Sequence, residues 1–407
     1  MQQQMENRLQ KNSFYTNTKK SIHLFLGFFF LVQTGIIAQN INIEGTILDE
    51  NKNTIPYAAI GIVEKSIGTS SNDDGVFFLK LTSLNLSDTL TVSSIGFKSY
   101  KIAVKDYINK KEKTIILVED VVSLDEITIT NVKPNFYVKK ALRNIRKTSL
   151  DSYHQLSILY RRFSTENYTP RFLVEQYINV LDKGLTLPSF EEIQVVENRK
   201  SADYRFVKKK QNFHAVAMIA KQNPLRKDFY ANDYKWEIKD YSSYDGEEIA
   251  ILEGIMKGKQ ANWVRLFIGV ETYGIYKLEK SHLNAVYIYK KNQDGKLYLS
   301  YHNREYKSKE PISPYYRKLM KLKTSKMDVS YRHEAIVLGI ETKWKNIDIR
   351  SNALKNRTDM GDYTIPYRKD FWKNLSMPPD SKFYLDNKKG LEAIFGVPLE
   401  KQYQPEN

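Results

Sequence analysis

Cysteine is absent from this sequence of 407 residues. Its absence excludes disulfide bonds, thiolate metal sites and cysteine nucleophiles together. It also excludes a lipid anchor of the kind that is attached to the N-terminal cysteine of a mature lipoprotein. Stability and any chemistry must therefore come from the other side chains.

Recognised catalytic and cofactor motifs are also absent, namely a Gly-rich phosphate loop, a Gly-x-Ser-x-Gly elbow and a His-Glu-x-x-His pair. Five histidines follow residue 38, and no two of them lie within a helical turn of each other: His154, His214, His282, His302 and His333. A metal site would need long-range convergence of these residues. The adjacent pairs Glu191-Glu192 and Glu247-Glu248 would point to opposite faces of a strand and cannot form a dyad. We therefore predict no catalytic residue, no cofactor and no metal ligand.

Long apolar runs are scarce, and the main one is SIHLFLGFFFLVQTGIIA at residues 21–38. Lys19 and Lys20 precede it, and it ends in the small residue Ala38. A positive segment followed by an apolar run and a small residue is typical of a secretory signal peptide. Polar residues at 33–34 make the run short for a membrane span of about 20 apolar residues. We expect cleavage after Ala38 and export to the periplasm or the outer membrane; an uncleaved anchor is the alternative.

The basic charge is concentrated in one part of the chain. The formal net charge is +16, whereas nine lysines balance nine acidic residues within 39–118, and the excess lies in 134–407. Such a domain suits nucleic acid, anionic lipid or an acidic glycan. The charges are scattered through strand-like segments, which favours an ordinary solvated surface. With an export signal present, we expect no nucleic-acid partner.

Aromatic residues are plentiful, with 28 Tyr and 19 Phe, and they favour a strand-rich chain because they fit a pleated, half-buried surface. Between residues 43 and 102, short apolar runs alternate with turn-forming clusters, a pattern that predicts a small β-sandwich. Asn72-Asp73-Asp74-Gly75 is the strongest turn signal, and it predicts a hairpin that returns through Val76-Phe77-Phe78-Leu79. Its two aspartates supply too few oxygens for a calcium site.

Four motifs of this segment occur together: Gly45-Thr46-Ile47-Leu48-Asp49, Pro56-Tyr57-Ala58-Ala59-Ile60, Thr69 to Phe77 and Ile95-Gly96-Phe97-Lys98-Ser99. As a set they resemble the carboxypeptidase-regulatory-like domain, a transthyretin-like β-sandwich. The resemblance covers about 80 residues. It implies an accessory domain, common in exported proteins of Bacteroidota, and does not imply peptidase activity.

The remainder predicts a second, β-rich domain. Pro134 begins a helix whose apolar residues, from Tyr137 to Ile145, fall on one face, which favours packing against a sheet. Ten strand-like segments follow, at 156–163, 171–181, 192–196, 234–241, 248–253, 263–270, 274–283, 285–290, 296–306 and 335–344. The run 234–306 predicts an antiparallel meander with one wet face. Residues 215–221 are a candidate helix.

The predicted fold is mainly β, with an N-terminal seven-stranded-type β-sandwich followed by a larger antiparallel, curved-sheet domain with a few helices. The predicted parts are a signal peptide (1–38), the sandwich (39–118), a linker strand (119–133) and the β-rich domain with an irregular tail (134–407). Residues 245–252 and 266–279 look like the repeated strands of curved-sheet periplasmic proteins related to the lipoprotein carriers. That resemblance implies a half-open sheet with an apolar concave face for a hydrophobic ligand or a partner strand. Residues 123–130 are similar to the segment that follows such sandwiches in TonB-dependent transporters, but the chain is too short for a transporter barrel.

Tyr287, Tyr289, Tyr298 and Tyr301 are a candidate platform for a sugar or another ligand, although ordinary sheet packing also explains them. We predict an exported envelope protein without catalytic activity, with a binding or structural role. Its partner would be a lipid, a glycan or another envelope protein, through which it would associate with the membrane. The alternative is a hydrolase whose acid and base residues converge only in the fold. Two carboxylates, or a histidine with a carboxylate, within reach in one pocket would favour that alternative.

Overall fold

The structure is a computed structural model that describes residues 40–65, 67–120, 132–208, 211–227, 229–349 and 358–403. The predicted signal peptide and most of the predicted linker strand lie outside these residues. The chain divides into two compact units. Residues 42–81 and 85–407 form the unit in which every site below lies; residues 1–41 and 82–84 form the other.

Two small sheets form the N-terminal sandwich. Its strands are β1 (Asn40–Asp49), β2 (Ala59–Ile62), β3 (Ile67–Ser70), β4 (Val76–Thr82), β5 (Thr89–Ser93), β6 (Tyr100–Ala103) and β7 (Thr114–Leu117), with the short helix α2 (Val104–Asn109) before β7. One sheet has the order β4-β1-β7, and the other has the order β3-β2-β5-β6. Alternate residues of β4 are buried, as in a strand that packs one face on a core. The sandwich prediction is confirmed.

The turn at Asn72–Gly75 differs from its prediction in one respect. Asn72 Oδ1 accepts hydrogen bonds from the amides of Asp74 and Val76, both at 2.9 Å, and Gly75 adopts φ +73°. The turn itself is therefore correct, but the hairpin is wrong, because β3 pairs with β2 while β4 lies in the other sheet. Local turn chemistry fixes the reversal of the chain but not the sheet that the next strand joins.

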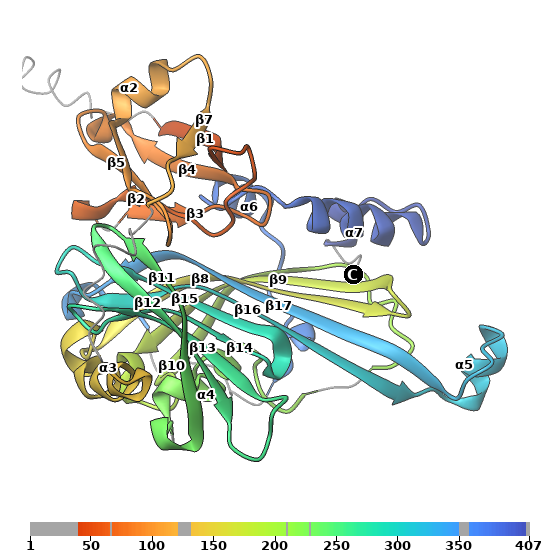
Figure 1. The fold of residues 1–407 in the computed structure, drawn as a ribbon. Helices are drawn as coiled ribbons and strands as arrows, with labels where there is room; N and C mark the ends of the chain where they lie inside the picture. The colour runs from red at the N-terminus through yellow and green to blue at the C-terminus, as the bar shows by residue number, and fades with distance from the viewer. Residues whose placement is uncertain are drawn as a thin grey trace, which may run out of the picture. The chain divides into compact units, whose positions relative to one another are not determined.

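A large antiparallel sheet follows (Figure 1). Its strands are β8 (His154–Glu166), β9 (Thr169–Asp182), β10 (Glu192–Lys200), β11 (Tyr234–Tyr244), β12 (Glu247–Met256), β13 (Trp263–Gly269), β14 (Ile275–Lys280), β15 (Ala285–Lys291), β16 (Leu297–Pro311) and β17 (Lys326–Glu341). Its order is β10-β9-β8-β17-β16-β15-β14-β13-β12-β11, so β17 returns to pair with β8. β11 to β16 form the predicted meander. One residue pair, Gly339 and Ile67, joins this sheet to the sandwich.

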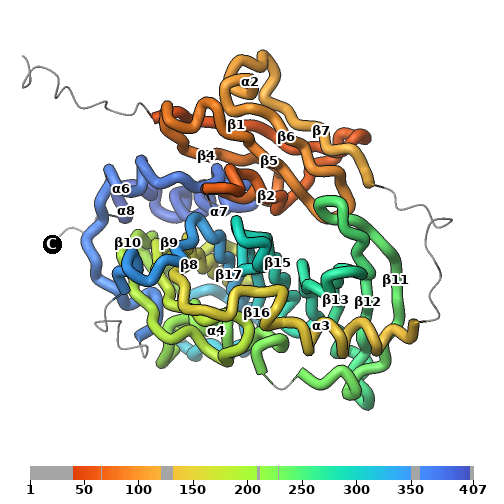
Figure 2. Tube along the Cα trace, turned by 90° about the vertical axis from the view of Figure 1, so that its left-hand side faces the viewer, coloured from red at the N-terminus to blue at the C-terminus, as the bar shows by residue number. Residues whose placement is uncertain are grey.

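Helices cover both faces of the large sheet (Figure 2). They are α3 (Pro134–Thr148), α4 (Ala217–Lys221), α6 (Lys369–Asn374), α7 (Lys382–Ala393) and α8 (Leu399–Gln402). A further short helix, α5 (Pro314–Leu319), lies in the connection between β16 and β17 at the end of these two strands (Figure 1). We call the face that packs on α3 and α4 the inner face; the side chains of Tyr160 and Arg162 lie on it. The outer face carries Arg161 and Phe163, and packs on α6, α7 and α8.

The predicted helix from Pro134 is confirmed as α3. It buries Tyr137, Val138, Ala141 and Ile145 in the large core of the inner face. Three turns of apolar face match what a helix needs to pack on a sheet. The basic residues of α3 that were expected on its other face are all exposed.

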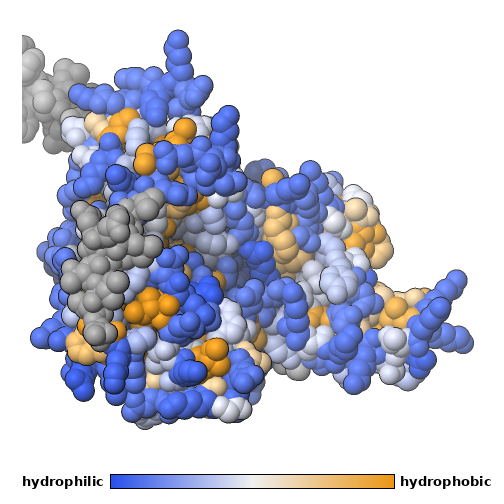
Figure 3. Space-filling view, viewed as in Figure 1, coloured by the Kyte–Doolittle hydropathy of each residue, from blue (hydrophilic) through white to orange (hydrophobic). Residues whose placement is uncertain are grey.

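The expectation of one wet face holds only in part. β11 alternates between exposed and half-buried residues, but residues 297–302 of β16 are buried on both faces. Trp372 of α6 and Tyr57 of the sandwich pack beside Tyr301 and so remove its outer face from water. The molecular surface in the view of Figure 3 is mainly hydrophilic, with apolar residues in small scattered groups. Among the described residues, no helix has both the length and the apolar character needed to cross a bilayer.

Candidate functional site

The centre of the large sheet carries charged side chains on both faces. Across β16, β17 and β8, the register pairs Arg304 with His333 and His333 with Arg162. Residues in direct register point to the same face of a sheet. Since Arg162 lies on the inner face, the three side chains form one row there, with an arginine on each side of His333. The next pair on this face is Tyr306 with Tyr331.

This row lines an open cleft of about 660 Å³. The other lining residues come from the segment around α4 and from the turn before β15: Gln211, Asn212, Phe213, Met218, Gln222, His282 and Leu283. The volume lies within the ~300–1,000 Å³ range of small-molecule sites. The lining combines aromatic and aliphatic groups with cations and amides, and it includes no carboxylate from the part of the chain that the structure describes.

Arg162 has a dedicated counter-ion behind the cleft. Its two terminal nitrogens donate to Asp359 at 2.8 and 3.1 Å, and both residues are buried. Burial acts to raise the pKa of Asp359, but hydrogen bonds and charge from Arg162 outweigh it, so that the pKa is lowered. The bidentate pair neutralises Arg162.

Arg304 lacks such a partner. It is 7% exposed, and its terminal nitrogens donate to the side-chain oxygen of Gln222 at 2.7 Å and to the carbonyl of Ala215 at 3.2 Å. Within the described ranges, no carboxylate lies within ion-pair distance, and its Nε has no hydrogen-bond partner. Lys280 donates to the backbone carbonyl of Gln222 at 2.7 Å, and burial together with Arg304 lowers the pKa of Lys280 to about 8.

Burial keeps the neighbouring histidines neutral. His333 Nδ1 lies 3.0 Å from the Tyr160 hydroxyl, and burial, followed by Arg304 and Arg162, lowers the pKa of His333 far below its usual range. Burial and Arg162 lower the pKa of His214 to about 3. No group of metal-ligating side chains occurs among the residues described.

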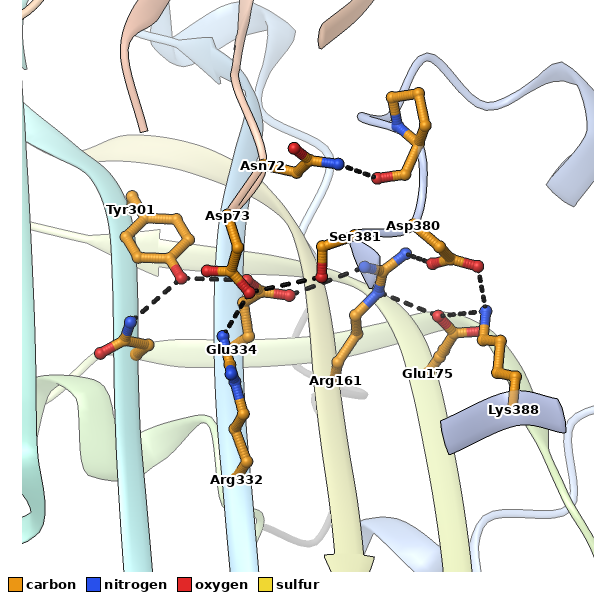
Figure 4. A network of polar contacts seen from close by, with 12 residues as sticks. Asn72, Asp73, Arg161, Glu175, Tyr301, Arg332, Glu334, Asp380, Ser381 and Lys388 are labelled. Carbon is orange, nitrogen blue, oxygen red and sulfur yellow. Dashed lines mark hydrogen bonds and ion pairs between the residues drawn. The ribbon is translucent and has the colours of Figure 1, made fainter. Parts of the chain in front are cut away.

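The outer face carries a second row of charged side chains. On β8 and β17 its members are the sequence neighbours of the residues in the first row. The register runs from Arg199 to Glu175, Arg161 and Glu334, so the charges alternate in sign across β10, β9, β8 and β17. Glu175 lies 2.7 Å from Arg199 Nε and 2.9 Å from Arg161 Nε. Arg161 also donates to Asp380 at 2.9 Å, which in turn accepts from Lys388 of α7 at 2.7 Å (Figure 4).

The same network reaches the turn of the sandwich. Arg332 Nη2 lies 2.6 Å from Asp73, and Ser381 donates to the same carboxylate at 3.3 Å (Figure 4). Tyr57 donates to the other oxygen of Asp73 and stacks on Tyr301 with ring centroids 4.0 Å apart. The acidic turn, which was expected to have too few oxygens for calcium, makes an ionic contact with Arg332 of β17.

The two buried glutamates of the outer row differ in their electrostatics. Burial would raise the pKa of Glu175, but Arg199, Lys388 and Arg161 together lower it well below its usual range. Burial dominates at Glu334 and raises its pKa, although Arg161 and Arg332 partly oppose the shift. The surrounding charges therefore stabilise the ionised form of Glu175 much more than that of Glu334.

A second cleft, of about 310 Å³, is lined by Glu305 and Asp328 near the far end of β16 and β17. Each carboxylate forms an ion pair of 2.8 Å with a lysine, Lys307 and Lys309 respectively. Both pairs are partly or largely exposed, as is usual for surface ion pairs.

The four predicted platform tyrosines are all buried, but they do not share one surface. Tyr287 and Tyr289 belong to the core of the inner face. Tyr298 pairs with Lys290, lies with it on the opposite face beside the sandwich strand β2, and Tyr301 lies in the outer-face cluster. Tyr289 accepts a hydrogen bond from Asn223 and Tyr301 donates to Glu334. A ligand role for these tyrosines remains a proposal. Of the tyrosine-rich strands, Tyr306 and Tyr331 are the residues that line the large cleft.

Comparison with known proteins addresses the N-terminal domain directly. Residues 43–129 match the CarboxypepD_reg-like domain family. The CarboxypepD_reg-like domain covers about a fifth of the chain, so it describes the sandwich and not the protein as a whole. A search of curated proteins finds no match to the sequence.

Solved structures show only distant likeness. They include a domain classed as an outer membrane lipoprotein-sorting protein from Vibrio parahaemolyticus (9% identity, TM-score 0.26, 55% of this chain and 98% of that one). A DUF1329 family protein from Desulfovibrio piger has 10% identity and a TM-score of 0.26, and the match covers 55% of this chain and 100% of that one. A LolA superfamily protein from Nitrosomonas europaea has 12% identity and a TM-score of 0.18, and the match covers 54% of this chain and 99% of that one. At such scores the likeness says nothing about what this chain binds.

Proposed function

We propose that the chain is an exported, non-catalytic binding protein of the cell envelope, located in the periplasm or at the outer membrane, which holds its ligand in the cleft of the inner face. The cleft carries the proposal, because it combines a ligand-sized volume with apolar groups and buried polar donors. The N-terminal leader supports export. The CarboxypepD_reg-like domain would serve as an accessory module.

The site chemistry favours binding over hydrolysis. A hydrolase would need a general acid and base that face the same substrate. His333 lines the cleft, but burial and two arginines hold it neutral, and no carboxylate joins it in the lining as described. The buried carboxylates Glu175 and Glu334 lie on the opposite face, where arginines surround them.

Purification of the chain from its native envelope fraction, followed by mass spectrometry, tests the proposal. We expect a reproducible small molecule to accompany the protein, and N-terminal sequencing to begin at Gln39. Met218→Trp, which places an indole in the cleft, should release the small molecule. Retention of the same molecule by this variant would place binding elsewhere, and recovery of nothing reproducible from the wild type would contradict a binding role.

A further inference from the structure

The charge balance of the cleft indicates what kind of ligand it takes. Burying a charge without a partner is costly, and proteins normally pair it. Arg162 follows this rule through Asp359, but Arg304, its neighbour on the same face, bonds only to neutral oxygens. The guanidinium of Arg304 is therefore buried beside an open cleft without a carboxylate partner among the described residues.

Two side chains that line the cavity each carry a buried donor atom without a hydrogen-bond partner. These donors are Arg304 Nε and the Tyr331 hydroxyl. Buried donors are nearly always satisfied, so each of these lacks something that water or a ligand would supply. Lys280 adds a second cation next to Arg304, since both bond to Gln222. Together these groups lack a hydrogen-bond acceptor that carries negative charge.

Apolar groups lie beside these donors. Phe213, Met218 and Leu283 line the cleft together with the ring of Tyr306. A small inorganic ion would leave this surface in contact with water, whereas a ligand with a short apolar portion would cover it. The cleft is also larger than one anionic group requires.

We infer that the cleft binds a ligand with an anionic headgroup, a phosphate or a carboxylate, held by Arg304 and Tyr331, and with an apolar portion against Phe213 and Met218. This inference rests on the proposed binding function and specifies its ligand class. Arg304 supplies a charge-assisted hydrogen bond and selects against neutral analogues, because a neutral ligand would leave the guanidinium unmatched.

Calorimetric titration of the full chain with three probes below their micelle-forming concentrations tests the inference. Octyl phosphate represents the complete ligand, inorganic phosphate the headgroup alone, and octyl glucoside a neutral amphiphile of the same chain length. We expect octyl phosphate to bind about tenfold or more tightly than either of the others, which is the scale of one charge-assisted contact. Equal affinity for inorganic phosphate would overturn the apolar portion of the inference.

Three variants separate recognition from folding. Arg304→Met should weaken octyl phosphate binding about tenfold or more, while the melting temperature stays the same or rises, since an unmatched buried charge is removed. Tyr331→Phe should weaken binding several-fold, and Arg304→Lys should retain part of it. Lys307→Met, on the same strand but 70% exposed at its side chain, is the matched control and should bind normally.

The outcomes also distinguish this inference from the proposed function. Tight binding of octyl glucoside, or unchanged binding of octyl phosphate to Arg304→Met, would overturn the anionic class while the cleft remains a binding site. Binding of none of the probes would overturn the inference, and the native purification would then decide separately whether the chain binds a ligand at all.

Discussion

Glu175→Gln is expected to lower the free energy of unfolding by about 3–5 kcal/mol, the usual cost of removing one partner from a buried ion pair. The substitution keeps the shape of the side chain but leaves Arg161, Arg199 and Lys388 with one less negative charge among them. Urea denaturation at neutral pH measures the change. Because the outer row connects four strands and α7, the loss should appear in global unfolding.

Glu334→Gln is the matched control for this prediction. The residue is equally buried and lies two positions along the same row, but burial raises its pKa, so that its charge is held less favourably. We therefore expect a clearly smaller loss of stability than for Glu175→Gln. Glu237→Gln, in an exposed pair with Lys239, should leave the unfolding midpoint unchanged. Equal losses at Glu175 and Glu334 would contradict the assignment of the row.

The loss of stability in Glu175→Gln should depend on pH, because the pKa of Glu175 is lowered in the folded state. The pKa of Glu175 is lower in the folded state than its ordinary value of 4.5, so its contribution to stability is fully present above that value. The contribution is lost as the pH falls through the folded-state pKa. The difference in stability between wild type and variant should be constant above about pH 5 and shrink in acid. A difference that grows in acid would contradict the direction of the shift.

Asp359→Asn is expected to cost about 3 kcal/mol, because it leaves Arg162 buried without its counter-ion beside the unmatched Arg304. Its amide would also meet the backbone N–H of Gln211, which now donates to the Asp359 carboxylate at 3.1 Å. Thermal unfolding measures the loss, and octyl phosphate should recover more of it than octyl glucoside does. Asp328→Asn, in an exposed pair with Lys309, is the control and should change little. Normal stability of Asp359→Asn would show that Arg162 does not depend on this carboxylate.

The sequence predicted the elements of the fold better than its charged centre. Hydrophobic periodicity identified α3 and the meander, because each buries one face. Their apolar residues therefore recur at the spacing of a helix or of a strand. The C-terminal strand was expected at 335–344, whereas β17 begins at Lys326. Residues 332–334, Arg-His-Glu, therefore lie in the strand but outside its expected bounds. His333 and Glu334 are buried in the sheet, where Arg162 and Arg161, far away in the sequence, lie opposite them.

The candidate site escaped sequence reasoning for the same reason. A charged residue is predicted to be exposed unless its partner is known. Here β8 and β17, which place Arg162 beside His333, are over a hundred residues apart in the sequence. One signal was nevertheless present. The consecutive arginines 161 and 162 lie within a segment that was correctly predicted as a strand, so one of them had to point to each face. Charges on both faces of a central strand indicate a polar site, and the two rows of this sheet are the result.

The structure of the chain crystallised with octyl phosphate tests the central claim most directly. We predict density for the phosphate within hydrogen-bond distance of Arg304 and the Tyr331 hydroxyl, with the alkyl chain against Phe213 and Met218. A saturated crystal in which the cleft holds only solvent, or in which the phosphate lies away from Arg304, would contradict the account.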